Sequence, residues 1–272
     1  MNSLRNVVRL YLSRKAPMSN RYLKIIAPAL TLGAILGVWQ VVVSLFRIPV
    51  YVLPPPSSIV IQGVDDWALL SGNVSITLLE SAAGFVAGSI VGFFLGVVMA
   101  EFDLFARCIL PFVVGSNAVP VIAIAPLVVL WLGTGIASKI ALAAFLCFFP
   151  LCINTFKGLQ ASDKQYRLLF SLYGATKREY LFQAKLPAAE AYIFAGLKLN
   201  AVFSVIGAIV AEFIGANGGL GFAMVQASYN LQVPRLWVNI IMSVCMGLAF
   251  YGLVWLFERI ILKRFHYSGV RD

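Results

Sequence analysis

The sequence predicts an all-α integral membrane protein with about six transmembrane helices. Its composition is the first reason, because 61% of the 272 residues are hydrophobic and only 12% are charged, with a mean hydropathy of +0.90. Soluble globular domains carry about twice that share of charged residues. The second reason is that several uncharged runs reach the roughly 20 residues that a helix needs to cross a bilayer core.

The apolar runs place these helices along the chain. In order, the predicted helices cover about residues 25–46, 81–100, 108–138, 140–156, 191–214 and 236–257. The third run contains Pro111, Pro120 and Pro126. Because proline removes a backbone hydrogen bond and clashes with the preceding turn, we expect this run to be kinked.

Glycines recur every four residues in the second predicted helix, at Gly84, Gly88, Gly92 and Gly96. On an α-helix this spacing places them on one stripe. A stripe without side chains lets the backbone of another helix approach closely. We therefore expect a tight helix–helix contact along this stripe.

Positive charge is concentrated in segments that would lie on one side of the membrane. With a cytoplasmic N-terminus, the outer segments hold only Arg47, Lys139 and Arg235, and nearly all the other Lys and Arg residues lie inside. This asymmetry predicts that both termini are cytoplasmic. The net charge of +10 therefore indicates topology and contact with anionic membrane lipid, and not nucleic-acid binding.

The chain is predicted to hold one membrane domain with short polar ends. Residues 1–24 form a basic cytoplasmic arm, residues 25–262 a single transmembrane domain and residues 263–272 a cytoplasmic tail. The only histidine, His266, lies in that tail. The cysteines lie in or beside apolar runs without metal-ligand spacing, so we expect no metal site and no cofactor bound by this chain.

A polar, basic segment at about residues 163–187 interrupts the apolar sequence. Gly174 permits a tight turn between two short helical pieces. Thr176 and Glu179 match a capping box at the start of the second piece, and Pro187 is expected to end that piece before the fifth helix. The residues expected on its exposed face are Tyr173, Lys177, Arg178 and Tyr180, types that are common in protein docking surfaces.

The spacing of Gly174 and Leu186-Pro187 resembles the cytoplasmic loop of binding-protein-dependent ABC importer permeases. That loop has the form Glu-Ala-Ala-x-x-x-Gly, then nine residues, then Ile-x-Leu-Pro. Other segments are similar to the nitrate/sulfonate/taurine-type branch of the family, and the likeness covers about residues 50–262. These segments include Leu53-Pro54, Pro120, Pro126, Gly133, Phe148-Phe149-Pro150, Glu212-Phe213-Ile214-Gly215-Ala216 and Gly219-Leu220-Gly221.

The loop departs from the family pattern at several positions. Leu168 occupies the acidic position, Leu169 and Phe170 the alanine positions, and Ala184 the isoleucine position. The docking surface is therefore expected to be less acidic and more apolar than is usual in the family.

The resemblance implies a type I ABC importer permease with a cytoplasmic coupling loop, located in a bacterial cytoplasmic (inner) membrane. It further implies cytosolic ABC ATPase subunits, an external solute-binding protein and a second permease chain in a homodimer. ATP would be used by the ATPase partner, since this chain has no Gly-x-x-x-x-Gly-Lys-[Ser/Thr] loop and is not expected to be an enzyme. The implied ATPase-coupling residues are Tyr173, Gly174, Ala175, Thr176, Lys177, Arg178, Leu186 and Pro187.

Asn117, Asn200 and Glu212 are the candidate residues of the translocation pathway. A carboxylate deep in lipid costs about 2.5–3.5 kcal/mol, so Glu212 should face an interior. A gate or pathway contact, a structural ion pair and an interfacial position near the outer surface all fit that position. Lys198 is expected to extend toward the cytoplasmic surface, with a pathway-lining position as the alternative.

Other functions fit the sequence less well. An ion-gradient-driven secondary transporter would need paired intramembrane acids or a proton relay, and among the apolar runs only Glu212 qualifies. An intramembrane enzyme would need a motif such as His-Glu-x-x-His, which the runs do not contain. A structural scaffold would not need the loop spacing. Nitrate, sulfonates, taurine and thiamine-precursor pyrimidines all remain open as the solute.

Overall fold

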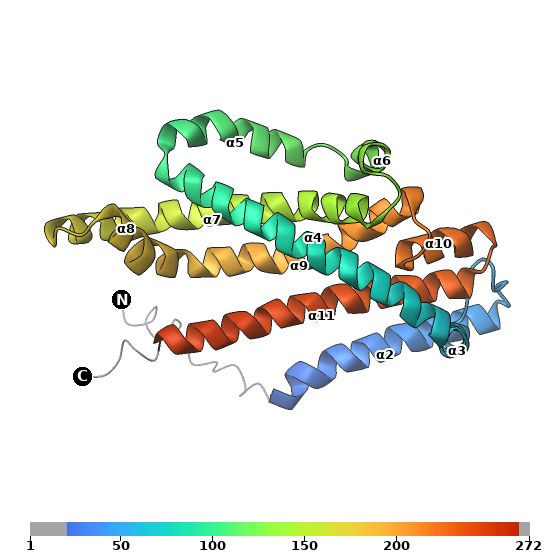
Figure 1. The fold of residues 1–272 in the computed structure, drawn as a ribbon. Coiled ribbons are helices and arrows are strands. Elements are labelled where there is room, and N and C mark those ends of the chain that lie inside the picture. Colours follow the sequence, from blue (N-terminus) through green and yellow to red (C-terminus); the bar gives the residue numbers. More distant parts are fainter. Residues whose placement is uncertain (1–20, 267–272) are drawn as a thin grey trace, which may run out of the picture. The chain divides into compact units, whose positions relative to one another are not determined.

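The computed structural model describes residues 21–266, with the side chains of residues 21–25, 117, 162–169 and 262–266 left undescribed. Every regular element in this described part is helical (Figure 1). The chain divides after Ile61 into two compact units. Residues 1–20 of the predicted arm and 267–272 of the predicted tail lie outside the described residues.

The first unit contains α2 (Arg21–Leu45) and the start of α3 (Pro56–Asp65). α2 agrees with the predicted first helix and is long and apolar enough to cross a membrane. The turn after it includes Arg47, which has a positive φ of 50°. The backbone N–H of Ser57 donates a 3.1 Å hydrogen bond to Oε1 of Gln40 and so connects the start of α3 to α2.

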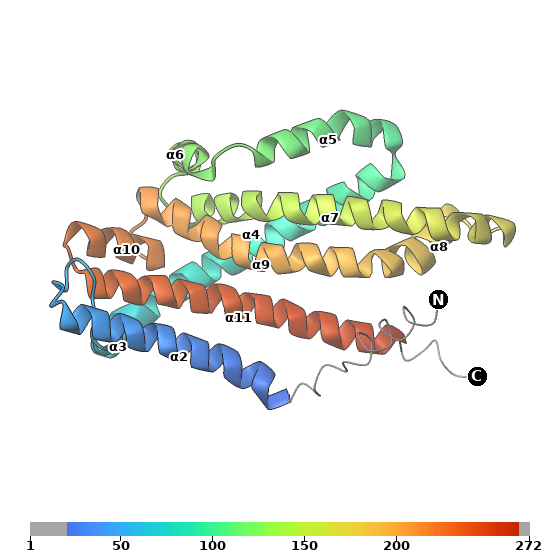
Figure 2. The same cartoon turned by 180° about the vertical axis from the view of Figure 1, so that it is seen from behind.

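The second unit is built around the long helices α4 (Trp67–Glu101), α7 (Ile136–Leu172), α9 (Leu186–Gly215) and α11 (Val233–His266). α4 crosses α7 and α9 diagonally, while α9 and α11 run side by side (Figures 1 and 2). Each of these helices contains a stretch that could cross a membrane by length and composition. The all-α membrane fold predicted from composition is therefore confirmed.

The glycine stripe of α4 forms the predicted close contact, and its partner is α7. A Cβ added to Gly88 would lie 2.7 Å from the Cβ of Cys147 and would also overlap the carbonyl oxygen of Ala144. A Cβ on Gly96 would lie 2.7 Å from the carbonyl oxygen of Cys152. The two backbones therefore approach too closely for any side chain at these positions.

The predicted third helix is broken rather than kinked. It consists of α5 (Asp103–Asn117) and α6 (Val121–Leu132), which bend by 99° across the break. Pro120 immediately precedes α6 and cannot donate the hydrogen bond that would continue α5. The described residues thus contain five helices that could each span a membrane. If the bent pair forms one further span, the total is six, which is the predicted number of transmembrane helices.

The fourth and fifth helices extend well beyond their predicted bounds. α7 is 37 residues long and continues to Leu172, so the first predicted loop piece is its last part. After Gly174, α8 (Lys177–Tyr180) passes through a π-helical turn, η1 (Leu181–Lys185), directly into α9. The prediction that Pro187 ends the second piece is wrong, because proline is tolerated in the first turn of a helix and here lies in the first turn of α9.

The glycine-rich segment after α9 leads into α10 (Leu220–Tyr229), a helix that none of the predicted helices covers. Gly219 precedes α10 with a φ of 100°, a conformation that favours glycine. α10 packs against α9 and α11 at the end of the second unit opposite α8 (Figures 1 and 2).

Candidate functional site

The predicted coupling loop is a tight turn between α7 and α8. Gly174 has a φ of 69°, and its N–H donates a 3.2 Å hydrogen bond to the carbonyl oxygen of Ser171. The N–H of Ala175 donates to the carbonyl oxygen of Phe170 at 3.1 Å. A Cβ at Gly174 would meet nothing within 4 Å. Glycine is therefore favoured here by the backbone conformation and not by crowding.

The predicted capping box is confirmed at the start of α8. The N–H of Glu179 donates to Oγ1 of Thr176 at 3.3 Å, and the N–H of Thr176 donates to Oε2 of Glu179 at 2.8 Å. Two backbone donors that would otherwise lack a partner are thereby satisfied at an exposed position. The cap fixes where α8 begins and thus how the exposed residues at the end of the loop are oriented.

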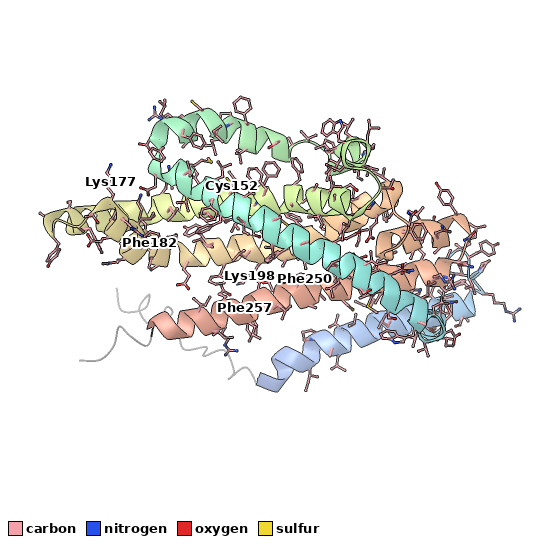
Figure 3. The ribbon with its side chains drawn as sticks, in the orientation of Figure 1. Cys152, Lys177, Phe182, Lys198, Phe250 and Phe257 are labelled. Atoms are coloured by element: carbon pink, nitrogen blue, oxygen red, sulfur yellow. The ribbon has the colours of Figure 1, made fainter. Side chains whose placement is uncertain are left out.

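The tip of the loop is apolar and basic. Leu172 and Tyr173 are 77% and 84% exposed, and Phe182 on η1 is 58% exposed. Lys177 and Arg178 are also exposed, and Figure 3 shows Lys177 and Phe182 at the α8 end of the helices. The sequence prediction missed Leu172 and Phe182, since apolar residues in an apolar chain give no local signal of exposure.

Other predicted loop residues lie closer to the protein. Tyr180, expected on the exposed face, is half-buried with its ring 5.4 Å from that of Phe170, so this part of the prediction is wrong. Leu186 is half-buried, while Pro187 is exposed. Next to them, the side chain of Lys185 is only 8% exposed. It forms a 2.8 Å ion pair with Glu101 at the end of α4.

Of the predicted pathway residues, Asn200 and Glu212 are buried inside the second unit, at 0% and 1% exposure. Nδ2 of Asn200 donates a 2.8 Å hydrogen bond to Oγ of Ser89, which connects α9 to α4. Asn117 is the last residue of α5, but its side chain lies outside the described part. In this chain Asn200 and Glu212 both contact α4.

Glu212 belongs to a buried polar cluster that also holds the start of α10. Its Oε1 accepts a 2.6 Å hydrogen bond from Oγ1 of Thr77, and its Oε2 accepts one of 2.5 Å from the N–H of Gly221. Oγ1 of Thr77 accepts a 2.8 Å hydrogen bond from the N–H of Leu220. One carboxylate and one hydroxyl thus join α4, α9 and the first turn of α10.

Two further charged residues belong to this cluster, Glu80 and Lys139. Glu80 on α4 is 4% exposed and lies within hydrogen-bonding reach of the Glu212 side chain. Lys139 is 1% exposed, and its Nζ donates 2.5 Å hydrogen bonds to the carbonyl oxygens of Thr134 and Gly215. The inference that Glu212 alone is an acidic residue of the apolar interior is therefore wrong.

The reason for that error is the length of α4. Glu80 precedes the uncharged run that begins at Ser81, and hydropathy alone places it outside the membrane. Because α4 already begins at Trp67, Glu80 lies well within the helix. Its carboxyl interacts electrostatically with Lys139, as does that of Glu212. The opposite charges offset part of the cost of burial.

Lys198 does not lie free at the cytoplasmic surface. Its Nζ forms a 2.5 Å ion pair with Oε2 of Glu258, which connects α9 to α11 and corrects the expectation of an extended, solvated side chain. Both side chains are mostly buried, with 20% and 16% exposure. Figure 3 labels Lys198 on α9 and Phe250 on the neighbouring helix α11.

Comparison with known proteins places this fold and loop in a family. Residues 88–263 match the family described as "Binding-protein-dependent transport system inner membrane component". A probable ABC transporter permease protein from Haemophilus influenzae is 31% identical over 88% of this chain and 98% of its own length. The formylaminopyrimidine transport permease protein ThiX from Halalkalibacterium halodurans is 31% identical over 86% and 94%.

A third relative covers nearly the whole chain. The putative aliphatic sulfonates transport permease protein SsuC from Bacillus subtilis is 31% identical over 94% of both chains. The nitrate import permease NrtB from Synechocystis and the taurine permease TauC from Escherichia coli are also similar, at 27% and 29% identity. The chain therefore belongs to the inner-membrane permease components of binding-protein-dependent ABC transport systems, in the nitrate/sulfonate/taurine branch.

Proposed function

We propose that this chain is the membrane-spanning subunit of an ATP-driven importer for a small solute. Two copies form the pathway as a homodimer, cytosolic ABC ATPase subunits bind the loop at Gly174, and an external solute-binding protein delivers the solute. The observation that carries the proposal is the loop itself. It presents Leu172, Tyr173 and Phe182 to solvent beside two exposed basic residues, which is an unusual surface unless another protein covers it.

The chemistry of that tip defines the ATPase surface that it fits. Leu172 and Tyr173 require an apolar cleft, and Lys177 and Arg178 require acidic groups at its rim. The remaining residues of the predicted coupling set, Ala175, Thr176, Leu186 and Pro187, then shape the turn and connect it to α9. The family pattern carries an acidic residue where this chain has Leu168, so a matching ATPase cleft would be correspondingly less basic.

The loop is suited to transmit force because it is continuous with two long helices. α7 enters it without a break, and α8 and η1 continue into α9. A displacement of the loop by closure of the ATPases therefore moves both helices, which pack against each other and against α4. Rigid helices moved at one end are a common route to alternating access. ATP hydrolysis itself takes place on the partner chains.

The relatives narrow the class of solute. Their names refer to formylaminopyrimidine, riboflavin, aliphatic sulfonates, nitrate and taurine, most of which are small polar molecules. We propose a solute of that kind, selected by the external binding protein, with Asn117, Asn200 and Glu212 contributing to the pathway or its gate. We further propose that both termini and the loop lie on the cytoplasmic side of the inner membrane, where basic residues contact its anionic lipid.

Uptake measurements test the energy source. Cells that produce this chain with its ATPase and binding protein would be given labelled taurine, an alkanesulfonate and a formylaminopyrimidine. We expect uptake of one of them to stop when ATP is depleted and to continue when a protonophore collapses the proton gradient. Uptake that stops with the protonophore while ATP is maintained would favour the secondary transporter and contradict the proposal. Cells without this chain provide the background.

A further inference from the structure

Lys185 is a buried lysine in a cytoplasmic loop. Its side chain is 8% exposed although the residues around it on α8 and η1 are largely solvated. Lysine is almost never buried without a partner. The partner here is Glu101, the last residue of α4, whose Oε1 lies 2.8 Å from Nζ of Lys185. The pair joins two segments 84 residues apart in the sequence.

Aromatic contacts hold Lys185 in place from the other side. Its Nζ lies 5.5 Å from the centre of the Tyr180 ring, a distance typical of a cation–π interaction. The Tyr180 ring in turn packs against Phe170 near the end of α7. The ammonium group is therefore located where the ends of α4 and α7 meet the helical segment that begins at α8.

The π-helical turn accounts for the direction in which Lys185 points. The N–H of Leu186 donates to the carbonyl oxygen of Leu181, five residues earlier, instead of four. One extra residue rotates everything after it by about 100° relative to an unbroken α-helix. Ala184 and Lys185 are the buried residues of this turn. A π-helical turn is rare and is frequently found at functional sites.

We propose that Lys185 is a positioning residue that connects the coupling loop to α4 through Glu101. α7 and α9 are joined to the loop by the chain itself, whereas α4 is not. The ion pair gives α4 an attachment at its end nearest the loop, so that loop displacement is transmitted to three helices together. The family's loop pattern leaves position 185 unspecified, so the pattern alone does not account for this connection. The proposal rests on the proposed function of the loop.

Charge exchange provides the test, in the purified full complex with its ATPase and binding protein. The variants are Lys185→Met, Glu101→Gln and the double exchange Lys185→Glu/Glu101→Lys. The measurement is the number of ATP molecules hydrolysed per solute transported, together with the amount of ATPase that co-purifies. Lys157→Met is the matched control, because Lys157 is an exposed lysine of α7.

In each single variant we expect the ATPase to co-purify normally and the ATP-to-solute ratio to rise roughly 5- to 10-fold, the usual size of coupling between sites. The double exchange should bring the ratio back toward the wild-type value, and Lys157→Met should not change it. A normal ratio in both single variants, or a double exchange no better than they are, would overturn the proposal. If Lys185→Met does not assemble, Glu101→Gln carries the same comparison, since it keeps the shape of the α4 end.

Failure of the importer function and failure of the connection to α4 give different results. If the proposed importer function is wrong, the wild-type complex itself shows no ATP-dependent uptake. If only the connection to α4 is wrong, the wild-type complex transports normally and so do the single variants.

Discussion

The hydroxyl of Thr77 on α4 lies 2.6 Å from Oε1 of Glu212 on α9, 135 residues further along the chain. Oγ1 of Thr77 also accepts a 2.8 Å hydrogen bond from the N–H of Leu220 at the start of α10. Replacing Thr77 by Val keeps the shape of the side chain but removes the hydroxyl that bonds to Oε1 of Glu212 and to the N–H of Leu220. We expect Thr77→Val to lower the free energy of unfolding by about 1–3 kcal/mol, the cost of an unsatisfied buried polar group.

Unfolding of the purified chain in detergent, followed by circular dichroism, measures this effect. Thr77→Ser keeps the hydroxyl and should retain most of the stability. Equal stability of the Val and wild-type proteins would mean that this hydroxyl does not hold α10 in place.

The contact between α4 and α7 gives a second prediction. A Cβ at Gly88 would lie 2.7 Å from the Cβ of Cys147, so Gly88→Ala must push the two helices apart. Overpacking of this kind typically costs about 1–3 kcal/mol. Gly72 lies on the same helix with nothing within 4 Å of an added Cβ. Gly72→Ala should therefore be neutral or slightly stabilising, and a thermal melt that ranks the two variants alike would contradict the contact.

The glycine stripe was predictable because its signal is local. A four-residue period on one helix indicates a close approach whatever the partner is. The identity of that partner was not predictable, because Gly84, Gly88, Gly92 and Gly96 contain no information about Ala144 or Cys152. The turn at Gly174 and the capping box at Thr176 were predictable for the same reason, since the pattern and the contact lie within a few residues.

Hydropathy failed at the helix ends and in the polar cluster. It marks where a helix leaves the apolar layer, whereas α7 continues as a helix to Leu172 because backbone hydrogen bonds do not end at the membrane surface. The same limitation hid Glu80, which lies on the helical stretch before Ser81. Its proximity to Glu212 and Lys139 depends on how three distant helices pack, and no single stretch of sequence records that.

The ion pair between Asp66 and Arg235 makes stability depend on pH. The hydrogen bond from Arg235 to Asp66, with Nε 2.6 Å from Oδ2, holds the pKa of Asp66 below its usual 3.8. A lowered pKa means that this stabilisation is present above pH 3.8 and is lost as the pH falls through the lower value of the folded protein. The pair is partly exposed, so its contribution is about 0.2–1 kcal/mol.

Asp66→Asn should therefore lower the melting temperature at pH 7 but not at pH values below the lowered pKa of folded Asp66, where this carboxyl is protonated in both states. The adjacent Asp65 is exposed, and Asp65→Asn serves as the control with the same change of charge. A difference between Asp66→Asn and wild type that persists unchanged at the lowest pH would show that charge is not its source.

The turn at Gly174 gives a prediction about coupling. Its φ of 69° costs a β-branched residue roughly 1–2 kcal/mol, whereas Asn tolerates it. We expect Gly174→Val to reduce uptake severalfold while ATP hydrolysis continues, or to release the ATPase, and Gly174→Asn to behave nearly as wild type. Because an added Cβ there meets nothing within 4 Å, normal uptake and normal co-purification of the ATPase in Gly174→Val would count against a coupling role for this turn.

Tyr173 allows the side of the membrane to be determined directly. It is 84% exposed at the tip of the loop, so a cysteine placed there should react with a membrane-impermeant maleimide whenever the reagent reaches that side. The exposed Cys108 and Cys245 would first be replaced by serine. With a cytoplasmic loop, Tyr173→Cys should be labelled in inverted membrane vesicles and protected in intact cells. Added ATPase should reduce the labelling in vesicles, because it would cover the same side chain. Labelling in intact cells would place the loop outside, where no ATPase could reach it, and the coupling mechanism would then be wrong.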